Sequence, residues 1–261
     1  MDDRTMPDAA ALAAFGVAGS RLERLAGGRG LTWRAGDVVL RPHDGAEETD
    51  WRAEVLASLE HTAAFRTPRP VATTDGSWRS GRWEAWEWLP GRADETRVAD
   101  VIRAGTAFHR AITHLDRPAF LDRKDNAWSR ADRMAWGEAE LPPDTTLDRL
   151  AAAFRPVESP AQLVHGDLLG NVLFAEGQPP AIIDWPPYWR PAGFDAAVAA
   201  VDAVCWHRVA VSALDALGDG IGEWRQLLVR ALTFRIATLH LLGSWDATGV
   251  ATHRPVVDAL V

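Results

Sequence analysis

The chain has 261 residues, of which 47% are hydrophobic and 25% charged, an ordinary composition for a globular protein with one large domain or two lobes. Its formal net charge of −8 argues against a general nucleic-acid-binding protein, because such proteins normally present a basic surface. No segment reaches the roughly 18–20 apolar residues of a membrane span. The first residues are acidic and lack a signal-peptide pattern, so we expect a cytoplasmic protein that does not enter a membrane.

Short apolar segments separated by turn residues predict a small sheet with one main helix in the first third of the chain. After a short helix over 7–18, the expected strands cover 21–25, 31–33, 38–41, 68–71 and 83–89. Apolar residues at helical spacing predict the main helix over 47–61. Pro90 and Gly91 interrupt the last strand, so we expect the boundary between two lobes, 1–90 and 91–261, at this point.

The rest of the chain is predicted to be mainly helical. Apolar residues at helical spacing indicate helices over 98–115, 144–154, 195–217 and 221–242. Asp144 is placed to cap the second of these helices. The charged segment 116–143 is expected to be a partly helical insertion. These elements predict an α+β fold with a small antiparallel-sheet lobe followed by a mainly helical lobe.

One segment, Leu163–Tyr188, combines polar residues in a pattern that indicates chemistry. It contains His165-Gly166-Asp167, then Asn171 four residues after that Asp, and finally Asp184. Each polar residue lies beside a short apolar run, which predicts a strand, a polar loop, a hairpin and a second strand. One carboxylate as base, with an amide and a second carboxylate as oxygen ligands for magnesium, is what phosphoryl transfer from ATP requires. A hairpin whose Asp and Asn only cap turns is the alternative.

With these residues the chain resembles the aminoglycoside phosphotransferase/choline kinase family, which has the protein-kinase-like fold. It is most similar there to an actinobacterial group in which an HGDxxGNVLF block is followed by a PYWRP run. The resemblance spans most of the chain, from a glycine-bearing hairpin to the helical lobe. It implies that lobe 1–90 binds the nucleotide and that lobe 91–261 carries the catalytic loop and the acceptor site.

The resemblance also implies roles for the polar residues of the loop. Asp167 would be the catalytic base, which accepts or orients the proton of the substrate hydroxyl. Asn171 and Asp184 would hold the magnesium ions that bridge the ATP phosphates. His165 would organise the loop through hydrogen bonds to the backbone. The spacing of four residues between Asp167 and Asn171 is one shorter than is usual in the family, and requires a tighter turn, for which Gly170 is suited.

Arg41 stands where the family normally has a lysine that contacts the ATP phosphates. Arginine keeps the positive charge but has a different shape, so the two are not equivalent. Its expected partner on the following helix is Glu54, with Glu47 and Glu48 as competing candidates.

Two further segments are candidates for nucleotide binding. Gly27, Gly28 and Gly30 permit close approach of the backbone to phosphates, although such a cluster by itself indicates only a hairpin turn. Glu87-Trp88-Leu89 corresponds to the hinge of the family, whose backbone groups bind adenine. An ordinary strand end is the alternative at this position.

The sequence therefore predicts a phosphotransferase that moves the γ-phosphoryl group of Mg²⁺-ATP to a hydroxyl of a small molecule, such as an aminoglycoside-like antibiotic or another amino-sugar. The acceptor and the choice between ATP and GTP stay open. The alternative is a nucleotide-binding pseudokinase with a regulatory function, which Arg41 and the shortened loop suggest. Some further residues could contact a substrate, although packing or a position on an exposed helix face also explains them. These residues are Tyr188, Trp189, Arg190, Asp202, Trp206, His207 and Glu223.

Overall fold

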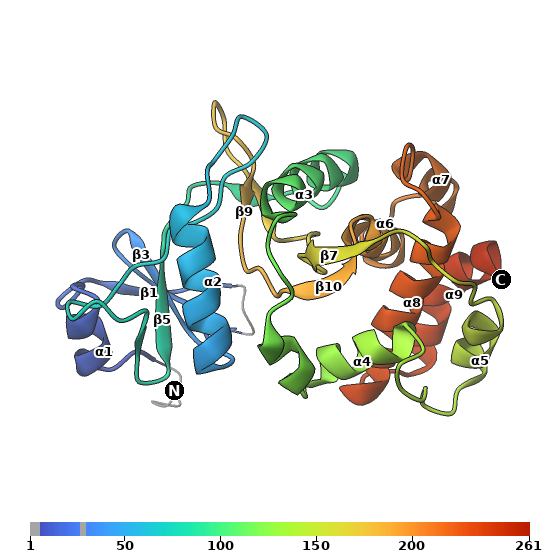
Figure 1. Cartoon of the computed structure of the whole chain (residues 1–261), viewed down its shortest axis with the longest axis horizontal. Coiled ribbons are helices and arrows are strands. Elements are labelled where there is room, and N and C mark those ends of the chain that lie inside the picture. Colours follow the sequence, from blue (N-terminus) through green and yellow to red (C-terminus); the bar gives the residue numbers. More distant parts are fainter. Residues whose placement is uncertain (1–5, 27–29) are drawn as a thin grey trace. The chain divides into compact units, whose positions relative to one another are not determined.

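The computed structural model describes residues 6–26 and 30–261, which form two compact units (Figure 1). Unit 1 ends at Gly91 and unit 2 begins at Arg92. In unit 1 the elements are α1 (Ala9–Ala14), β1 (Leu22–Arg24), β2 (Trp33–Ala35), β3 (Val38–Pro42), α2 (Ala46–Ser58), β4 (Arg79–Ser80) and β5 (Trp83–Glu87).

The strands of unit 1 form one antiparallel sheet in the order β1-β2-β3-β5-β4. The sheet and α1 share an apolar core that includes Phe15, Trp33, Leu40 and Trp83. The register of β3 and β5 places Arg41 opposite Glu84. This pairing brings a cationic and an acidic side chain together in the middle of the sheet.

One strand predicted for unit 1 is absent from the described residues. Over 68–71 the structure has a single bridge, between Pro70 and Trp86, instead of a strand. The N–H of Val71 still donates to the carbonyl of Ala85 at 2.9 Å, so the segment lies along β5. Pro68 and Pro70 have no N–H to donate, and the ladder therefore cannot be completed.

Unit 2 contains short strands and a helical body. Its elements are β6 (Arg92–Ala93), α3 (Val98–Ile112), the 3₁₀ helix η3 (Ala119–Arg123), α4 (Ala127–Ala135), α5 (Thr145–Ala152), β7 (Ala161–Val164), β8 (Val172–Phe174), β9 (Ala181–Ile182), β10 (Tyr188–Pro191), α6 (Phe194–Trp206), the 3₁₀ helix η4 (Val211–Ala213), α7 (Leu214–Leu217), α8 (Trp224–Leu241) and α9 (Ala247–Leu260). β7 pairs with β10, and β8 pairs with both β6 and β9, in each case antiparallel.

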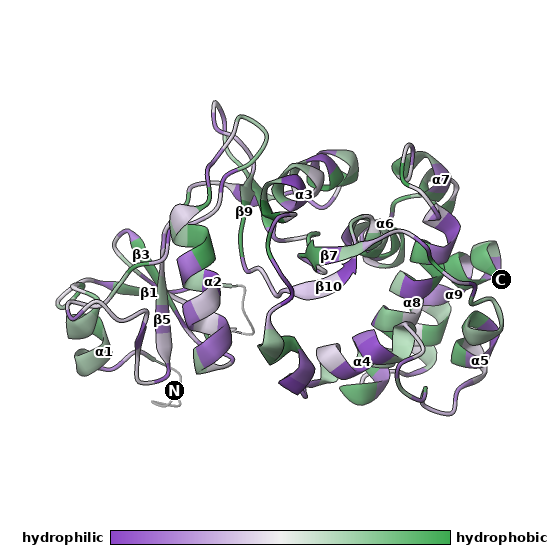
Figure 2. Ribbon diagram, in the orientation of Figure 1, coloured by the Kyte–Doolittle hydropathy of each residue, from purple (hydrophilic) through white to green (hydrophobic). Residues whose placement is uncertain are grey.

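The core of unit 2 lies around α6 and α8. Hydrophobic residues are frequent along both helices (Figure 2), and α8 contacts α4, α5, α6 and α9. The rings of Phe194 and Phe234 pack together at this centre, with their centroids 6.0 Å apart. A helix that is buried on nearly all sides tolerates few charged residues. No helix in the described ranges is long and apolar enough to cross a membrane.

The predicted helices at the C-terminal end were partly wrong. The helix expected over 195–217 ends at Trp206, because Arg208 has a left-handed backbone with φ of 60°. The chain then continues through η4 and α7. The structure also has an unexpected helix, α9, which Asp246 caps and which tolerates Pro255 in its interior.

Asp144 caps α5, as predicted, and this cap yields a testable stability effect. One carboxylate oxygen accepts from the N–H groups of Thr146 and Leu147, and the other accepts from Trp245 Nε1 at 3.0 Å. Asp144→Ala should lower the free energy of unfolding by about 1–2 kcal/mol in denaturant titrations, because it removes a helix cap and a link to the segment before α9. The exposed Asp148 in the same turn is the control. An equal loss for Asp148→Ala would contradict the capping role.

Candidate active site

The polar loop of unit 2 connects β7 to β8 and is held by the buried side chain of His165. The His165 N–H donates to Nε2 of His109 on α3 at 3.1 Å. Its ring Nδ1 accepts from the Asp167 N–H at 3.3 Å, so Nε2 carries the proton and donates to the Ile183 carbonyl at 2.9 Å. The imidazole thus joins the loop to the strand end that precedes Asp184.

Two glycines allow the tight path of this loop. Gly166 has a φ of 70°, and a Cβ there would lie 2.4 Å from the ring of Tyr188. Gly170 has a φ of 87° at the third position of a turn that is closed by the bond from the Asn171 N–H to the Leu168 carbonyl at 2.9 Å. This turn accommodates the spacing of four residues between Asp167 and Asn171.

The side chains of Asp167 and Asn171 meet within the loop. Asn171 Nδ2 donates to the backbone carbonyl of Asp167 at 2.8 Å and to its Oδ2 at 3.3 Å. Both amide protons are therefore directed at Asp167, and Oδ1 of Asn171 is left to act as an acceptor. The Asp167 side chain is 45% exposed, so a substrate can reach its carboxylate.

Asp184 lies next to this pair. The Asn171 carbonyl accepts from the N–H of Ile183 at 3.0 Å, which places Asn171 beside the residue that precedes Asp184. Asp184 is exposed and has a left-handed backbone with φ of 52°, a conformation that is costly for a residue other than glycine. A carboxylate and an amide oxygen are hard ligands, and they fit Mg²⁺, which usually binds few protein groups.

A second partner of Asp167 was not predicted from the sequence. Arg235 on α8 donates from Nη2 to Oδ1 of Asp167 at 2.5 Å. Arg235 in turn pairs with Asp202 on α6. From the sequence, Asp202 was expected either to contact the substrate or to lie on an exposed helix face. One feature of the sequence could have indicated this pair. Asp202 and Arg235 are each a single charged residue within a mainly apolar segment of a predicted helix.

Behind the loop lies a buried acid–imidazole pair. Oδ2 of Asp195 is 3.2 Å from Nε2 of His109, and both side chains are 2% exposed. Because Nε2 of His109 accepts the His165 N–H, an ionised carboxylate at this place would face a nitrogen lone pair. Burial raises the pKa of Asp195 to about 8, and burial together with nearby His165 lowers the pKa of His109 to about 3. Both groups are therefore neutral in the folded protein.

This neutral pair predicts a pH-dependent effect of Asp195→Asn. In the unfolded chain Asp195 ionises near its ordinary pKa, so the carboxyl contributes stability at low pH that is lost as the pH rises towards 8. The amide of the variant keeps the shape and cannot ionise. Relative to wild type, Asp195→Asn should therefore become progressively more stable between pH 5 and pH 8 in thermal unfolding. A relative stability that stays constant over this range would contradict the raised pKa of Asp195.

In unit 1, Arg41 belongs to a network of buried charges. Its Nε donates to Glu84 Oε1 at 2.5 Å, and Arg52 on α2 donates to both oxygens of Glu84 at 2.8 Å. Burial opposes ionisation of Glu84, but Arg52 and Arg41 lower its pKa to about 2. The expected partner Glu54 is instead exposed on α2 and does not pair with Arg41.

The sequence offered one signal for this network, which was missed. Glu84 lies in β5 between Trp83 and Ala85, and a buried acid within a strand needs a charged partner. Glu48 also contributes, with Oε1 3.6 Å from Nη1 of Arg52. Helix α2 is thus joined to the sheet by Arg52 and Glu84, and a second ion pair joins α2 to β4.

The remaining nucleotide candidates also lie in unit 1. The N–H groups of Glu87 and Trp88 donate at 2.8 Å to the carbonyls of Arg69 and Asp37. Within the described part of the chain, the Leu89 N–H has no such partner. Gly30 accepts from Arg24 Nε at 2.7 Å, whereas Gly27 and Gly28 lie outside the described residues.

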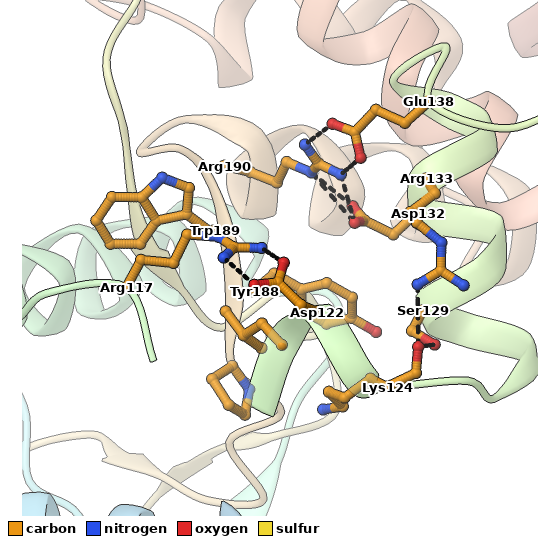
Figure 3. A pocket seen from close by; sticks show the side chains of 12 residues that line it. Arg117, Asp122, Lys124, Ser129, Asp132, Arg133, Glu138, Tyr188, Trp189 and Arg190 are labelled. Atoms are coloured by element: carbon orange, nitrogen blue, oxygen red, sulfur yellow. Dashed lines mark hydrogen bonds and ion pairs between the residues drawn. The ribbon is translucent and has the colours of Figure 1, made fainter. Parts of the chain in front are cut away.

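A pocket of about 230 Å³ lies in unit 2 among η3, α4 and β10 (Figure 3). Arg190 crosses it and pairs with Asp132 at 2.7 Å and with Glu138 at 2.6 Å. Tyr188 lines the pocket and also packs on Gly166, so the pocket adjoins the loop of Asp167. Glu223 does not line this pocket. Its carboxylate instead accepts from the backbone N–H groups of residues 158 and 159.

Comparisons with known proteins define the class and then the family. A thermostable mutant of aminoglycoside phosphotransferase APH(4)-Ia, in a ternary complex with AMP-PNP and hygromycin B, is 15% identical with a TM-score of 0.61, and the match covers 92% of this chain and 93% of that one. An aminopropanol kinase associated with a microcompartment is 16% identical, with coverage of 93% and 90% and a TM-score of 0.54. A choline/ethanolamine kinase family protein from Mesorhizobium loti is 17% identical, with coverage of 93% and 88% and a TM-score of 0.58.

The fold is therefore the predicted two-lobed, protein-kinase-like α+β fold. The family described as "Phosphotransferase enzyme family" matches residues 21–229, and the chain belongs to this family. No curated protein matches the chain in sequence. The predicted resemblance and the predicted class, a phosphotransferase, are confirmed at this level.

Proposed function

We propose that the protein transfers the γ-phosphoryl group of ATP, bound with Mg²⁺, to a hydroxyl group of a small molecule. The observation that carries this proposal is the arrangement of the polar loop. An accessible carboxylate, Asp167, lies in hydrogen-bond contact with Asn171, and Asp184 follows the residue to which Asn171 is bonded. These are the groups that phosphoryl transfer needs in one place.

In this proposal Asp167 receives the hydroxyl of the acceptor. Phosphoryl transfer proceeds through a loose transition state, so the enzyme gains more from orienting the hydroxyl than from a strong base. Asp167 accepts the hydrogen bond of the hydroxyl and takes its proton as the bond from the acceptor oxygen to the γ-phosphorus forms. The bond from that phosphorus to the β–γ bridging oxygen breaks in the same step, and ADP leaves. His165 keeps the loop in shape and does not move a proton itself, because both of its ring nitrogens are engaged with backbone groups.

Asn171, through Oδ1, and Asp184, through its carboxylate, would hold magnesium. When bound, the ion neutralises negative charge on the phosphates. For the nucleotide itself we propose contributions from unit 1, namely the Arg41 guanidinium for phosphate and the Leu89 N–H for the base. Arg41 keeps a positive charge at this position of the sheet, and its pairing with Glu84 fixes its orientation.

We propose the pocket of unit 2 as the place of the acceptor. Its lining includes four basic residues and three acidic ones, namely Arg117, Lys124, Arg133, Arg190, Asp122, Asp132 and Glu138. Such a lining favours a polar compound with many hydrogen-bonding groups, and Trp189 provides an aromatic face for a sugar ring. Because a structural neighbour is a complex with hygromycin B, aminoglycoside-like antibiotics and other amino-sugars are the first acceptors to test.

The alternative, a nucleotide-binding pseudokinase, has less support. It was suggested by Arg41 and by the short spacing in the loop. The turn at Gly170 nevertheless directs Asn171 back to Asp167, so the shortened loop keeps its polar groups together. A protein that only binds nucleotide has no need for an exposed carboxylate in this place.

Acceptor-dependent release of ADP tests the proposed activity. A coupled ADP assay with aminoglycosides, other amino-sugars, nucleosides and amino alcohols should identify at least one acceptor that is turned over. Asp167→Ala should lower this turnover by at least about 10²-fold, because the acceptor hydroxyl loses the group that orients it. The exposed Asp215 on α7, changed to Ala, is the matched control. Turnover that survives in Asp167→Ala would assign the chemistry to another group.

A second test addresses the metal ligands. Asp184→Asn should weaken Mg²⁺-dependent ATP binding by about tenfold or more in calorimetric titrations, because a carboxylate ligand is replaced by a neutral amide. Glu176→Gln, which removes one negative charge from the exposed hairpin turn between β8 and β9, is the control. Equal affinities for wild type and Asp184→Asn would remove Asp184 from the metal site.

A further inference from the structure

Arg235 connects the loop of Asp167 with the buried core of unit 2. Its Nε donates to Asp202 at 2.9 and 3.2 Å, and its Nη2 donates to the same carboxylate at 2.5 Å. Nη2 also donates to Oδ1 of Asp167 at 2.5 Å. The side chains of Arg235 and Asp202 are 9% and 6% exposed, whereas that of Asp167 is 45% exposed. One buried guanidinium therefore bridges a buried carboxylate and an accessible one.

Asp202 by itself is sufficient to pair the buried arginine. Its side-on contact with Nε and Nη2 neutralises the charge and fixes the plane of the guanidinium. Burial raises the pKa of Asp202, and the adjacent guanidinium opposes that rise. The additional contact with Asp167 is therefore not needed to bury Arg235. Instead, this contact determines the orientation of the Asp167 carboxylate.

Both oxygens of Asp167 are held in this way. Oδ1 accepts from Arg235 and Oδ2 accepts from Asn171, so rotation of the carboxylate would break one bond or the other. In a loose phosphoryl-transfer transition state, the orientation of this carboxylate matters more than its strength as a base.

We propose that Arg235, anchored by Asp202, is a positioning residue that orients the Asp167 carboxylate towards the acceptor hydroxyl. This inference rests on the proposed function, since it assigns Arg235 a part in the same reaction. It predicts that changes at Arg235 reduce kcat and leave the KM for ATP near that of wild type.

Arg230 offers a matched control on the same helix. Arg230 and Arg235 are both buried, but the two hydrogen bonds of Arg230 reach only the backbone carbonyls of Ala135 and Arg155. Loss of either arginine removes a buried cation from α8. Only Arg235 touches the carboxylate of Asp167, so only its loss should change the catalytic step.

The experiment compares Arg235→Gln, Arg235→Lys and Arg230→Gln in the ADP assay, with the acceptor that wild type turns over, and in thermal unfolding. Arg235→Gln should lower kcat by about 10²-fold at nearly unchanged KM for ATP. Arg235→Lys should recover part of this loss, because an ammonium keeps the charge without the fork of the guanidinium. Arg230→Gln should lower Tm and keep the wild-type kcat. The proposal is overturned if Arg235→Gln retains as much kcat as Arg230→Gln, or if lysine restores nothing.

A double-mutant cycle separates this inference from the proposed function. If wild type turns over no acceptor, the proposed function fails, and the pairing is then judged from Tm alone. The Tm loss of Arg235→Gln combined with Asp167→Asn should be smaller than the sum of the losses of the two single variants. Strictly additive losses would show that the two side chains do not interact, and would overturn the inference whatever the activity.

Discussion

The buried imidazole of His165 is the constraint on which the arrangement of unit 2 depends. It accepts from the backbone of its own loop and donates to the carbonyl of Ile183, so the β7–β8 loop and the end of β9 are fixed relative to each other. These bonds act together with the bond from the Ile183 N–H to the Asn171 carbonyl, which joins the same two segments. A second buried ring, that of His109, supports the first from α3. Neutral imidazoles suit this role, because they satisfy buried backbone groups without burying a charge.

Arginine–carboxylate pairs fix the buried charged residues in both units, but the arrangement of the charges differs. In unit 1 a single carboxylate, Glu84, lies between two arginines, which keeps it ionised and joins α2 to the sheet. In unit 2 a single guanidinium, that of Arg235, lies between two carboxylates. In unit 1 Glu48 also pairs with Arg52, so the two arginines of this network are balanced by two glutamates. In unit 2 the two carboxylates outnumber the guanidinium, and the exposed one is the carboxylate proposed to receive a hydroxyl.

Local sequence rules predicted those features that depend on neighbours in the chain. Asp144 was recognised as a cap because its partners are the next residues along the helix. Gly170 was recognised because the short spacing requires a tight turn, and glycine readily adopts the left-handed backbone that such a turn can contain. The same rules failed over 68–71 and over 195–217. In the first segment prolines prevent the ladder, and in the second Arg208 adopts a left-handed conformation that no local signal in the sequence indicates.

The sequence by itself determined the class of this protein, because His165, Asp167, Asn171 and Asp184 lie within one short segment and their spacing carries the chemistry. It also determined the succession of a small sheet and a helical body. Only the tertiary structure decided the partners of the buried charges. Arg41 meets Glu84 rather than Glu54, and Asp167 meets Arg235, 68 residues further along the chain. Such pairs depend on which strand register and which helix packing bury the most apolar surface, and a one-dimensional pattern does not contain that information.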